Sequence, residues 1–304
     1  MTRPIRDLAA SVRQRLSNLA KAQGRPAAEV MQYYAMERFL YRLGISPHRD
    51  RFLLKGALML WAWRAPATRP TLDIDLLGRG RNHTTELERI MRELCDAAPD
   101  APDGLVFDAD SVAGEDITVE SEYVGVRIRF LATLGTARVR MQVDIGFGDA
   151  VIDEDAAIEL PTLLDLPAPS LRGYSRETAI AEKLNAMFQH GRLNSRMKDY
   201  FDIGLLARYF PFDGRKLARA IAATFARRET TIVADPVGLA DAFAHEPGKQ
   251  VQWAAFLRKI RSTEAAADLS AQVATLRAFL GPALAALAQG ATFDKQWPAG
   301  GPWQ

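Results

Sequence analysis

Two aspartates separated by a single residue form the pattern in this sequence that is best suited to chemistry. Asp73 and Asp75 flank Ile74 within the stretch 71–77, whose composition predicts a β-strand that stops at Gly78. Because alternate side chains of a strand share a face, both carboxylates should project from one face while Ile74 enters the core. Two carboxylates held this close repel each other unless a cation neutralises them. The spacing therefore predicts a metal site, although an Asp-x-Asp pair is also common at exposed strand ends and turns.

The stretch 137–147 supplies a candidate third carboxylate. Its apolar and polar residues alternate, with Val143 and Ile145 on the side expected to be buried and Asp144 on the other side. Carboxylate oxygens suit Mg²⁺, which usually shares its coordination with substrate phosphates. Three carboxylates can hold two metal ions about 3.5–4 Å apart, which activate an attacking oxygen and stabilise a leaving phosphate. We therefore expect Asp73, Asp75 and Asp144 to bind Mg²⁺, with Mn²⁺ as an alternative.

A lysine and a glycine stand upstream of the aspartates, between the apolar run 52–54 and a short helix that includes Leu58. Glycine allows the backbone to come close to a phosphate, and the N–H groups at a helix start favour anions. Lys55 and Gly56 are therefore candidate nucleotide-binding residues. The pair indicates little by itself, because many helices begin this way.

The elements that must position these residues are predicted to form an α+β chain. Helices are expected from residue 8, over 27–43, after residue 57 and from Thr85, where Thr85-x-x-Glu88 matches a capping box. Strands of an antiparallel sheet are expected at 117–119, 124–130 and 137–147. After the prolines near 161–169 the pattern becomes helical, with helices expected at 175–190, 198–209, 214–227, 236–245, 249–261 and 268–288.

This order of elements predicts four parts. They are an N-terminal helical arm (1–50), a mixed α/β core (51–170), a helical C-terminal region (171–288) and a flexible tail (289–304). The tail is expected to be flexible because it is rich in glycine and proline.

Composition narrows the class of protein. The chain has 304 residues, of which 48% are hydrophobic, enough for a packed core, and its net charge of +2 gives no global attraction to polyanions. Local basic patches could still bind nucleic acid, although solvated surfaces are the more common explanation of any one patch. The candidate patches are Arg127, Arg129, Arg138 and Arg140; Arg192 to Lys198; and Arg215, Lys216 and Arg219. A single cysteine, Cys95, excludes an intrachain disulfide, and we expect a cytoplasmic protein that does not engage a membrane.

Four ordered segments together resemble the AbiEii/AbiGii family of nucleotidyltransferase toxins, from type IV toxin–antitoxin systems. The first two are Phe52-Leu53-Leu54-Lys55-Gly56-Ala57-Leu58-Met59-Leu60 and Arg69-Pro70-Thr71-Leu72-Asp73-Ile74-Asp75-Leu76. The third runs from Tyr174 through Leu184 and includes Lys183, and the fourth is Arg196-Met197-Lys198-Asp199-Tyr200-Phe201-Asp202-Ile203. The resemblance covers about residues 25–260 and implies a polymerase-β-like nucleotidyltransferase core with a mixed sheet, followed by a helical C-terminal region.

The resemblance also implies a role for each matching residue. Gly56 would belong to the loop that binds the nucleotide phosphates, and Asp73 and Asp75 would hold the catalytic metal together with Asp144. Lys183 would contact the triphosphate. Lys198, Asp199 and Asp202 would complete the site from the helical half. One position departs from the family pattern, because Ala57 stands where a second glycine is usual.

Without the family resemblance, Lys183 and the Lys198–Asp202 pair have simpler explanations. Lys183 borders the apolar side of its helix, where a lysine often extends to water. Lys198 and Asp202 are four residues apart and could form an ordinary ion pair within a helix.

The function implied by the resemblance is transfer of a nucleoside monophosphate from an NTP to an RNA acceptor, in particular the 3′ end of tRNA, which would block translation. A toxin of this type would have a cognate antitoxin and could act in phage defence. Two alternatives stay open. One is nucleotidyl transfer to a protein or a small molecule, and the other is a non-catalytic relative that binds a nucleotide or an antitoxin.

Overall fold

The computed structural model describes residues 7–66, 69–119, 123–152, 157–260 and 264–304. The chain divides by its internal contacts into two units. The first unit comprises Met1–Arg64, Pro70–Gly148 and Asp155–Gly173, and the second comprises Ala65–Arg69, Asp149–Glu154 and Tyr174–Gln304. The expected arm and core thus share one unit, and both of the short segments 65–69 and 149–154 group with the helical C-terminal region.

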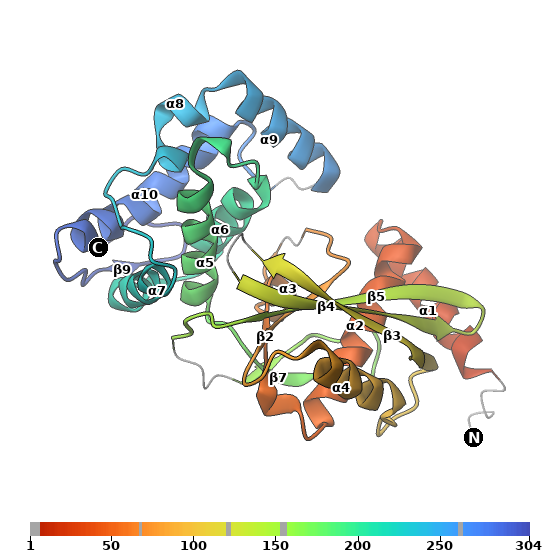
Figure 1. Ribbon diagram of the computed structural model, residues 1–304. Helices are drawn as coiled ribbons and strands as arrows, with labels where there is room; N and C mark the ends of the chain where they lie inside the picture. The colour runs from red at the N-terminus through yellow and green to blue at the C-terminus, as the bar shows by residue number, and fades with distance from the viewer. Residues whose placement is uncertain (1–6, 67–68, 120–122, 153–156, 261–263) are drawn as a thin grey trace. The chain divides into compact units, whose positions relative to one another are not determined.

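A seven-stranded mixed sheet forms the centre of the first unit, in the order β3-β4-β5-β2-β1-β7-β6 (Figure 1). Its strands are β1 (Phe52–Lys55), β2 (Ile74–Gly78), β3 (Leu105–Val119), β4 (Tyr123–Leu134), β5 (Ala137–Phe147), β6 (Ala157–Glu159) and β7 (Ser170–Gly173). β3, β4 and β5 are antiparallel, as predicted, whereas β2 pairs with β5 in parallel. The α+β fold with a mixed sheet is therefore confirmed.

Several strand predictions need correction. β2 begins at Ile74 rather than at residue 71, and β3 begins at Leu105, well before the predicted 117. A register shift in β3 between Asp108 and Ala113 interrupts the regular alternation, which explains why its first half gives no strand pattern. β6 and β7 flank the prolines near 161–169, and neither strand was predicted.

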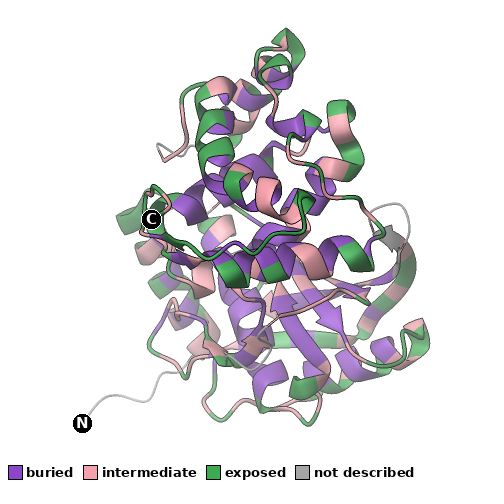
Figure 2. Ribbon diagram, turned by 90° about the vertical axis from the view of Figure 1, so that its left-hand side faces the viewer, coloured by how far each residue is buried: buried purple, intermediate pink, exposed green. Residues whose placement is uncertain are grey.

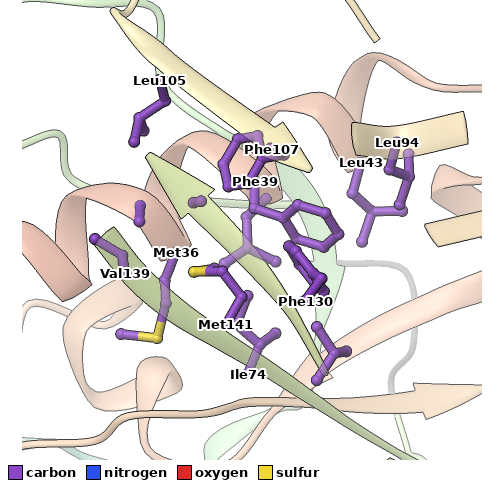
Figure 3. Close-up of a cluster of buried hydrophobic side chains, with 14 of the residues drawn as sticks. Met36, Phe39, Leu43, Ile74, Leu94, Leu105, Phe107, Phe130, Val139 and Met141 are labelled. Carbon is purple, nitrogen blue, oxygen red and sulfur yellow. The ribbon is translucent and has the colours of Figure 1, made fainter. Parts of the chain in front are cut away.

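The helices of the first unit cover one face of the sheet. They are α1 (Leu8–Gln23), α2 (Ala27–Ile45), α3 (Leu58–Ala62) and α4 (Thr84–Asp96). The core between α2, α4 and the sheet includes Met36, Phe39, Leu94, Phe130 and Met141, all nearly inaccessible to solvent (Figure 3). Strands β1 and β2 are also largely buried. Buried ribbon, drawn in purple, runs through the strands and the helices packed on them (Figure 2). Because α2 is buried along most of its length, it belongs to this core rather than to a separate arm.

The start of α4 also differs from the prediction. Its N-cap is His83, without a side-chain cap, so the expected capping box does not form. The carboxylate of Glu88 accepts a hydrogen bond from Gly114 N–H instead, at 2.7 Å. Glu88 thus joins α4 to β3. Cys95, at the other end of α4, is buried, and burial raises the pKa of its thiol to about 12, as suits an inert structural thiol.

The second unit is mainly helical. Its helices are α5 (Arg176–His190), α6 (Met197–Tyr209), α7 (Gly214–Arg227), α8 (Asp241–Ala244), α9 (Pro247–Ile260) and α10 (Leu269–Ala288), with β8 (Phe212–Asp213) and β9 (Gln296–Trp297) as a small second sheet. The helix expected at 236–245 is interrupted at Ala240, between a 3₁₀ turn (Val237–Leu239) and α8. Among the described residues, α10 alone is long and apolar enough to cross a membrane by length and composition, and its buried residues, such as Phe279 and Leu280, are those of a core helix.

The stretch 289–304, expected to be a flexible tail, packs onto the helices of the second unit. β9 pairs with β8, and Trp297 is buried, donating a hydrogen bond from its indole to Ala207 O at 2.7 Å. The indole of Trp303 stacks on Phe279, with 5.7 Å between ring centroids. Burial of these aromatic rings offsets the conformational freedom of the neighbouring glycines.

Candidate active site

The pairing of β2 with β5 brings the three predicted metal ligands together. Asp75 lies directly opposite Asp144 in the parallel register, and Asp73 immediately precedes β2. One carboxylate oxygen from each of these residues lies within 4.8 Å of the others. We call Asp73, Asp75 and Asp144 the carboxylate group. Their neighbours Ile74 and Val143 are fully buried on the opposite face, so local alternation orients the carboxylates as predicted.

The carboxylate group fits a divalent cation. Oxygens that share one Mg²⁺ lie at most about 4.2 Å apart, because each Mg–O distance is about 2.1 Å. The observed spread of 4.8 Å therefore needs only a small closure of the side chains. All three residues are half-buried, which leaves room for ligands from a substrate.

Neighbouring side chains hold two of these carboxylates in place. The Thr71 hydroxyl donates to Asp73 Oδ1. Arg127 lies opposite Asp144 in the β4–β5 register and donates to both of its oxygens, with Nε–Oδ1 at 2.8 Å and Nη2–Oδ2 at 2.7 Å. From the sequence alone, Arg127 is recognisable only as part of a basic patch. Its contact with Asp144 depends on strand register, which no local pattern reveals.

Gly56 lies so close to the carboxylate group that only glycine fits at this position. Its φ of 73° favours glycine, and a Cβ at this position would lie 2.0 Å from Asp75 Oδ2. Ala57, in contrast, has an ordinary right-handed backbone, with φ −68° and ψ −29°. The alanine that replaces the usual second glycine is therefore accommodated without strain. Lys55 lies opposite Asp75 in the β1–β2 register, so both predicted loop residues adjoin Asp75.

The second group of predicted residues lies on α5 and α6 within the second unit. Lys183 Nζ donates to Asp202 Oδ2 at 2.7 Å and to Asp199 Oδ1 at 3.3 Å. Arg69 Nε donates to Asp202 Oδ1 at 3.1 Å, and Arg196 Nε donates to Asp199 Oδ2 at 2.6 Å. We call these five residues the lysine–aspartate cluster.

The local sequence explains how Lys183 is oriented. Ser175 caps α5 by accepting a hydrogen bond from Thr178 N–H at 3.1 Å. Ile180 and Leu184 of this helix are fully buried, so Lys183 stands at the edge of the buried face. Its side chain is only 14% exposed and is ion-paired, so it does not simply extend to water.

In the lysine–aspartate cluster, the positive and negative groups each keep the other ionised. Burial alone would raise the pKa of Asp202, but the Arg69 and Lys183 cations outweigh burial and hold that pKa below its ordinary value. Burial alone would lower the pKa of Lys183, but Asp202 and Asp199 raise it above its ordinary value. Both groups are therefore charged at neutral pH.

The alternative of a Lys198–Asp202 pair within α6 is not what the structure shows. Asp202 pairs with Lys183 and Arg69, while Lys198 is exposed. Arg69 and Arg196 were missed as members of the cluster, although both occur in the segments that carried the family resemblance. A buried aspartate on a predicted helix requires a cation, which is the signal that could have drawn attention to them.

The mixed sheet with its carboxylate group, and the helical region with Lys183, each carry the residues expected of a nucleotidyltransferase of α+β fold. The particular family follows from comparison with known proteins. Residues 38–282 match the family described as "Nucleotidyl transferase AbiEii toxin, Type IV TA system". This match spans more than half of the chain, which therefore belongs to the AbiEii nucleotidyltransferase toxin family. Membership implies an NTP substrate and a cognate antitoxin.

Two solved structures from Helicobacter pylori are similar in fold. One is a nucleotidyltransferase candidate, with 14% identity, a TM-score of 0.47 and coverage of 86% of this chain and 95% of that chain. The other is JHP933, with 14% identity, a TM-score of 0.45 and coverage of 86% and 92%. No curated protein sequence matches at a significant level. The family assignment rests on the match over residues 38–282.

Proposed function

We propose that the protein transfers a nucleoside monophosphate from an NTP to an RNA acceptor, the 3′ end of tRNA, and so blocks translation. The observation that carries this proposal is the carboxylate group beside Gly56. One oxygen from each of its three carboxylates lies within 4.8 Å of the others. In the proposed reaction an acceptor hydroxyl attacks the α-phosphorus of the NTP. The bond to the bridging oxygen then breaks, and pyrophosphate leaves.

The carboxylate group is proposed to hold Mg²⁺, or Mn²⁺. Such an ion would neutralise triphosphate charge and favour ionisation of the attacking hydroxyl. Asp73, Asp75 and Asp144 supply only oxygen ligands, which both ions accept. Gly56 keeps space beside Asp75 that a side chain would fill.

Lys183 is proposed to contact the triphosphate. Two of its three ammonium hydrogens are directed to Asp202 and Asp199, which leaves one donor for a phosphate oxygen. Asp199, Asp202 and Lys198 are proposed to complete the nucleotide site, with the two aspartates orienting Lys183. Because the cluster is preorganised, little free energy is lost in orienting Lys183 during the reaction.

The test is to incubate the full chain with each α-³²P-labelled NTP, Mg²⁺ and total tRNA, beside the Asp73→Ala/Asp75→Ala variant. We expect one NTP to label tRNA at its 3′ end, and this label to be absent with the variant. Label on a protein or a small molecule instead of tRNA would show that the acceptor is not RNA. Absence of label with every NTP would favour a non-catalytic binding protein.

Toxicity provides a second readout. Expression of the wild-type chain should arrest growth, and Asp75→Ala should relieve the arrest while leaving a folded protein. Growth arrest that persists in Asp75→Ala would exclude catalysis as the toxic mechanism.

A further inference from the structure

Four arginines share the solvent-facing side of strands β4 and β5. In the antiparallel register, Arg127 lies opposite Asp144, Arg129 opposite Gln142, Arg140 opposite Leu131, and Arg138 opposite Thr133. Cross-strand partners and residues two apart on a strand point to the same face, so these arginines form one surface with Asp144. The opposite face is the core, where Ile128, Phe130 and Met141 are buried. We call Arg127, Arg129, Arg138 and Arg140 the arginine stripe.

The stripe is most positive at the end far from the carboxylate group. Arg127 pairs with Asp144, and Arg129, whose side chain is 53% exposed, pairs with Glu115 at 2.8 Å. Arg138 and Arg140 are exposed, and neither forms an ion pair within the described part of the chain. Two uncompensated guanidinium groups therefore lie side by side on this face.

The geometry of the stripe suits an extended polyanion. From Asp144 to Arg138 the strand advances by six residues, which is about 20 Å at roughly 3.4 Å per residue. Arg138 and Arg140 are two residues apart, and so about 7 Å apart along the strand. Guanidinium groups bind phosphates bidentately, so a row of them can hold several phosphates of one strand.

We propose that the arginine stripe binds the sugar–phosphate backbone of the RNA acceptor and directs its 3′ end toward the carboxylate group. This inference rests on the proposed function and adds a surface to it. An acidic protein could also be attracted to arginines. RNA is favoured because the stripe ends at Asp144, a member of the carboxylate group that would have to receive the terminal hydroxyl.

The experiment measures binding of end-labelled tRNA to the full chain by fluorescence anisotropy over a series of salt concentrations. The test variant is Arg138→Thr/Arg140→Thr, because threonine is well suited to an exposed strand. The control variant, Arg49→Thr/Arg89→Thr, removes the same charge from side chains that are 49% and 57% exposed elsewhere and lie in none of the candidate basic patches. Circular dichroism and thermal melting verify that both variants are folded.

We expect the test variant to bind tRNA at least about tenfold more weakly at low salt. The slope of log K against log salt should become shallower by about 1.4, because each phosphate of a single strand that an arginine neutralises adds about 0.7 to the slope. The control variant should match the wild type in slope, and binding of a fluorescent NTP should be unchanged in both variants.

The possible failures are distinguishable. If the wild-type chain binds no RNA, the proposed acceptor is wrong, and the role of the stripe with it. If the wild type binds and labels tRNA while the test variant keeps the same slope and affinity, only the stripe is contradicted.

Discussion

The guanidinium of Arg127 engages both carboxylate oxygens of Asp144, at 2.8 Å from Nε to Oδ1 and 2.7 Å from Nη2 to Oδ2. Asp144 is also one of the three carboxylates that can share a cation. A divalent ion must therefore compete with Arg127 for the same oxygens, and it is repelled by the guanidinium charge. This pair should keep the affinity of the carboxylate group for a divalent ion low when no nucleotide is bound.

Replacing Arg127 should strengthen divalent ion binding in the absence of nucleotide. In Arg127→Gln the amide can still donate one hydrogen bond to Asp144, but the competing charge is gone. We expect Mn²⁺ to bind several-fold more tightly, measured by electron paramagnetic resonance of unbound Mn²⁺. Arg129→Gln, two residues away on the same face, serves as the control. Weaker Mn²⁺ binding in Arg127→Gln would show instead that Arg127 is needed to position Asp144.

Arg69 should contribute to the stability of the second unit. It is one of two cationic partners of Asp202, whose side chain is only 1% exposed. Arg69→Met leaves this buried carboxylate with Lys183 alone, and hydrogen bonds to buried charged groups are worth about 1.5–3 kcal/mol. We expect a loss of stability in that range in urea unfolding. Arg208→Met, which breaks an exposed pair with Glu264, should cost under about 0.5 kcal/mol. Equal losses in the two variants would contradict the importance of the buried pair.

Glu37 should give the first unit a pH-dependent stability. Its side chain is fully buried, and burial raises its pKa from 4.5 to about 7, although Arg38 opposes this shift. Below pH 4.5 the carboxyl is protonated in both the folded and the unfolded chain. As the pH rises from 4.5 to 7, the unfolded chain loses this proton while the folded chain retains it. The free energy of unfolding therefore falls across this window and is not recovered above it.

The measurement is urea unfolding of the wild type and Glu37→Gln from pH 5 to pH 8. The stability of the variant relative to the wild type should increase up to pH 7, by at most about 1.4 kcal/mol per pH unit. It should then level off. A difference that does not change with pH would mean that Glu37 ionises normally in the folded chain.

The packing of the C-terminal stretch can be tested at Trp297. This side chain is 5% exposed, contacts Phe279 with 4.9 Å between ring centroids, and donates to Ala207 O. Trp297→Ala should cost about 3–5 kcal/mol, as for other large core aromatics. Gln289→Ala, at an exposed position of the same stretch, should change thermal stability very little. Unchanged melting of Trp297→Ala would restore the expectation of a flexible tail.

How far the sequence predicts this molecule depends on how local each feature is. β5 was predicted at 137–147 and is found at Ala137–Phe147, because one face is apolar and the other polar along its whole length. β7 was missed because its four residues follow a proline and offer too short a pattern. The role of the C-terminal tryptophans was missed because their partners, such as Phe279, are distant in sequence.

In the candidate site, too, local features are predictable and long-range pairings are not. Asp73 and Asp75 are recognisable from their spacing alone. Asp144 is a candidate because of the alternation in its own strand, but the parallel pairing that places it opposite Asp75 joins residues 69 positions apart (75 to 144), which no local pattern contains. The Arg127–Asp144 and Arg69–Asp202 pairs depend on register and helix packing, which no local pattern contains.

The central claim is that the carboxylate group supports nucleotidyl transfer by binding a divalent ion. The most direct test compares nucleotide transfer by the wild type and by Asp75→Asn and Asp144→Asn, with and without EDTA, while Mn²⁺ binding is measured on the same samples. We predict that the wild type transfers label only when a divalent ion is present, and that both variants lose Mn²⁺ binding and transfer together. Transfer at the wild-type rate by either variant, or by the wild type in EDTA, would contradict the claim.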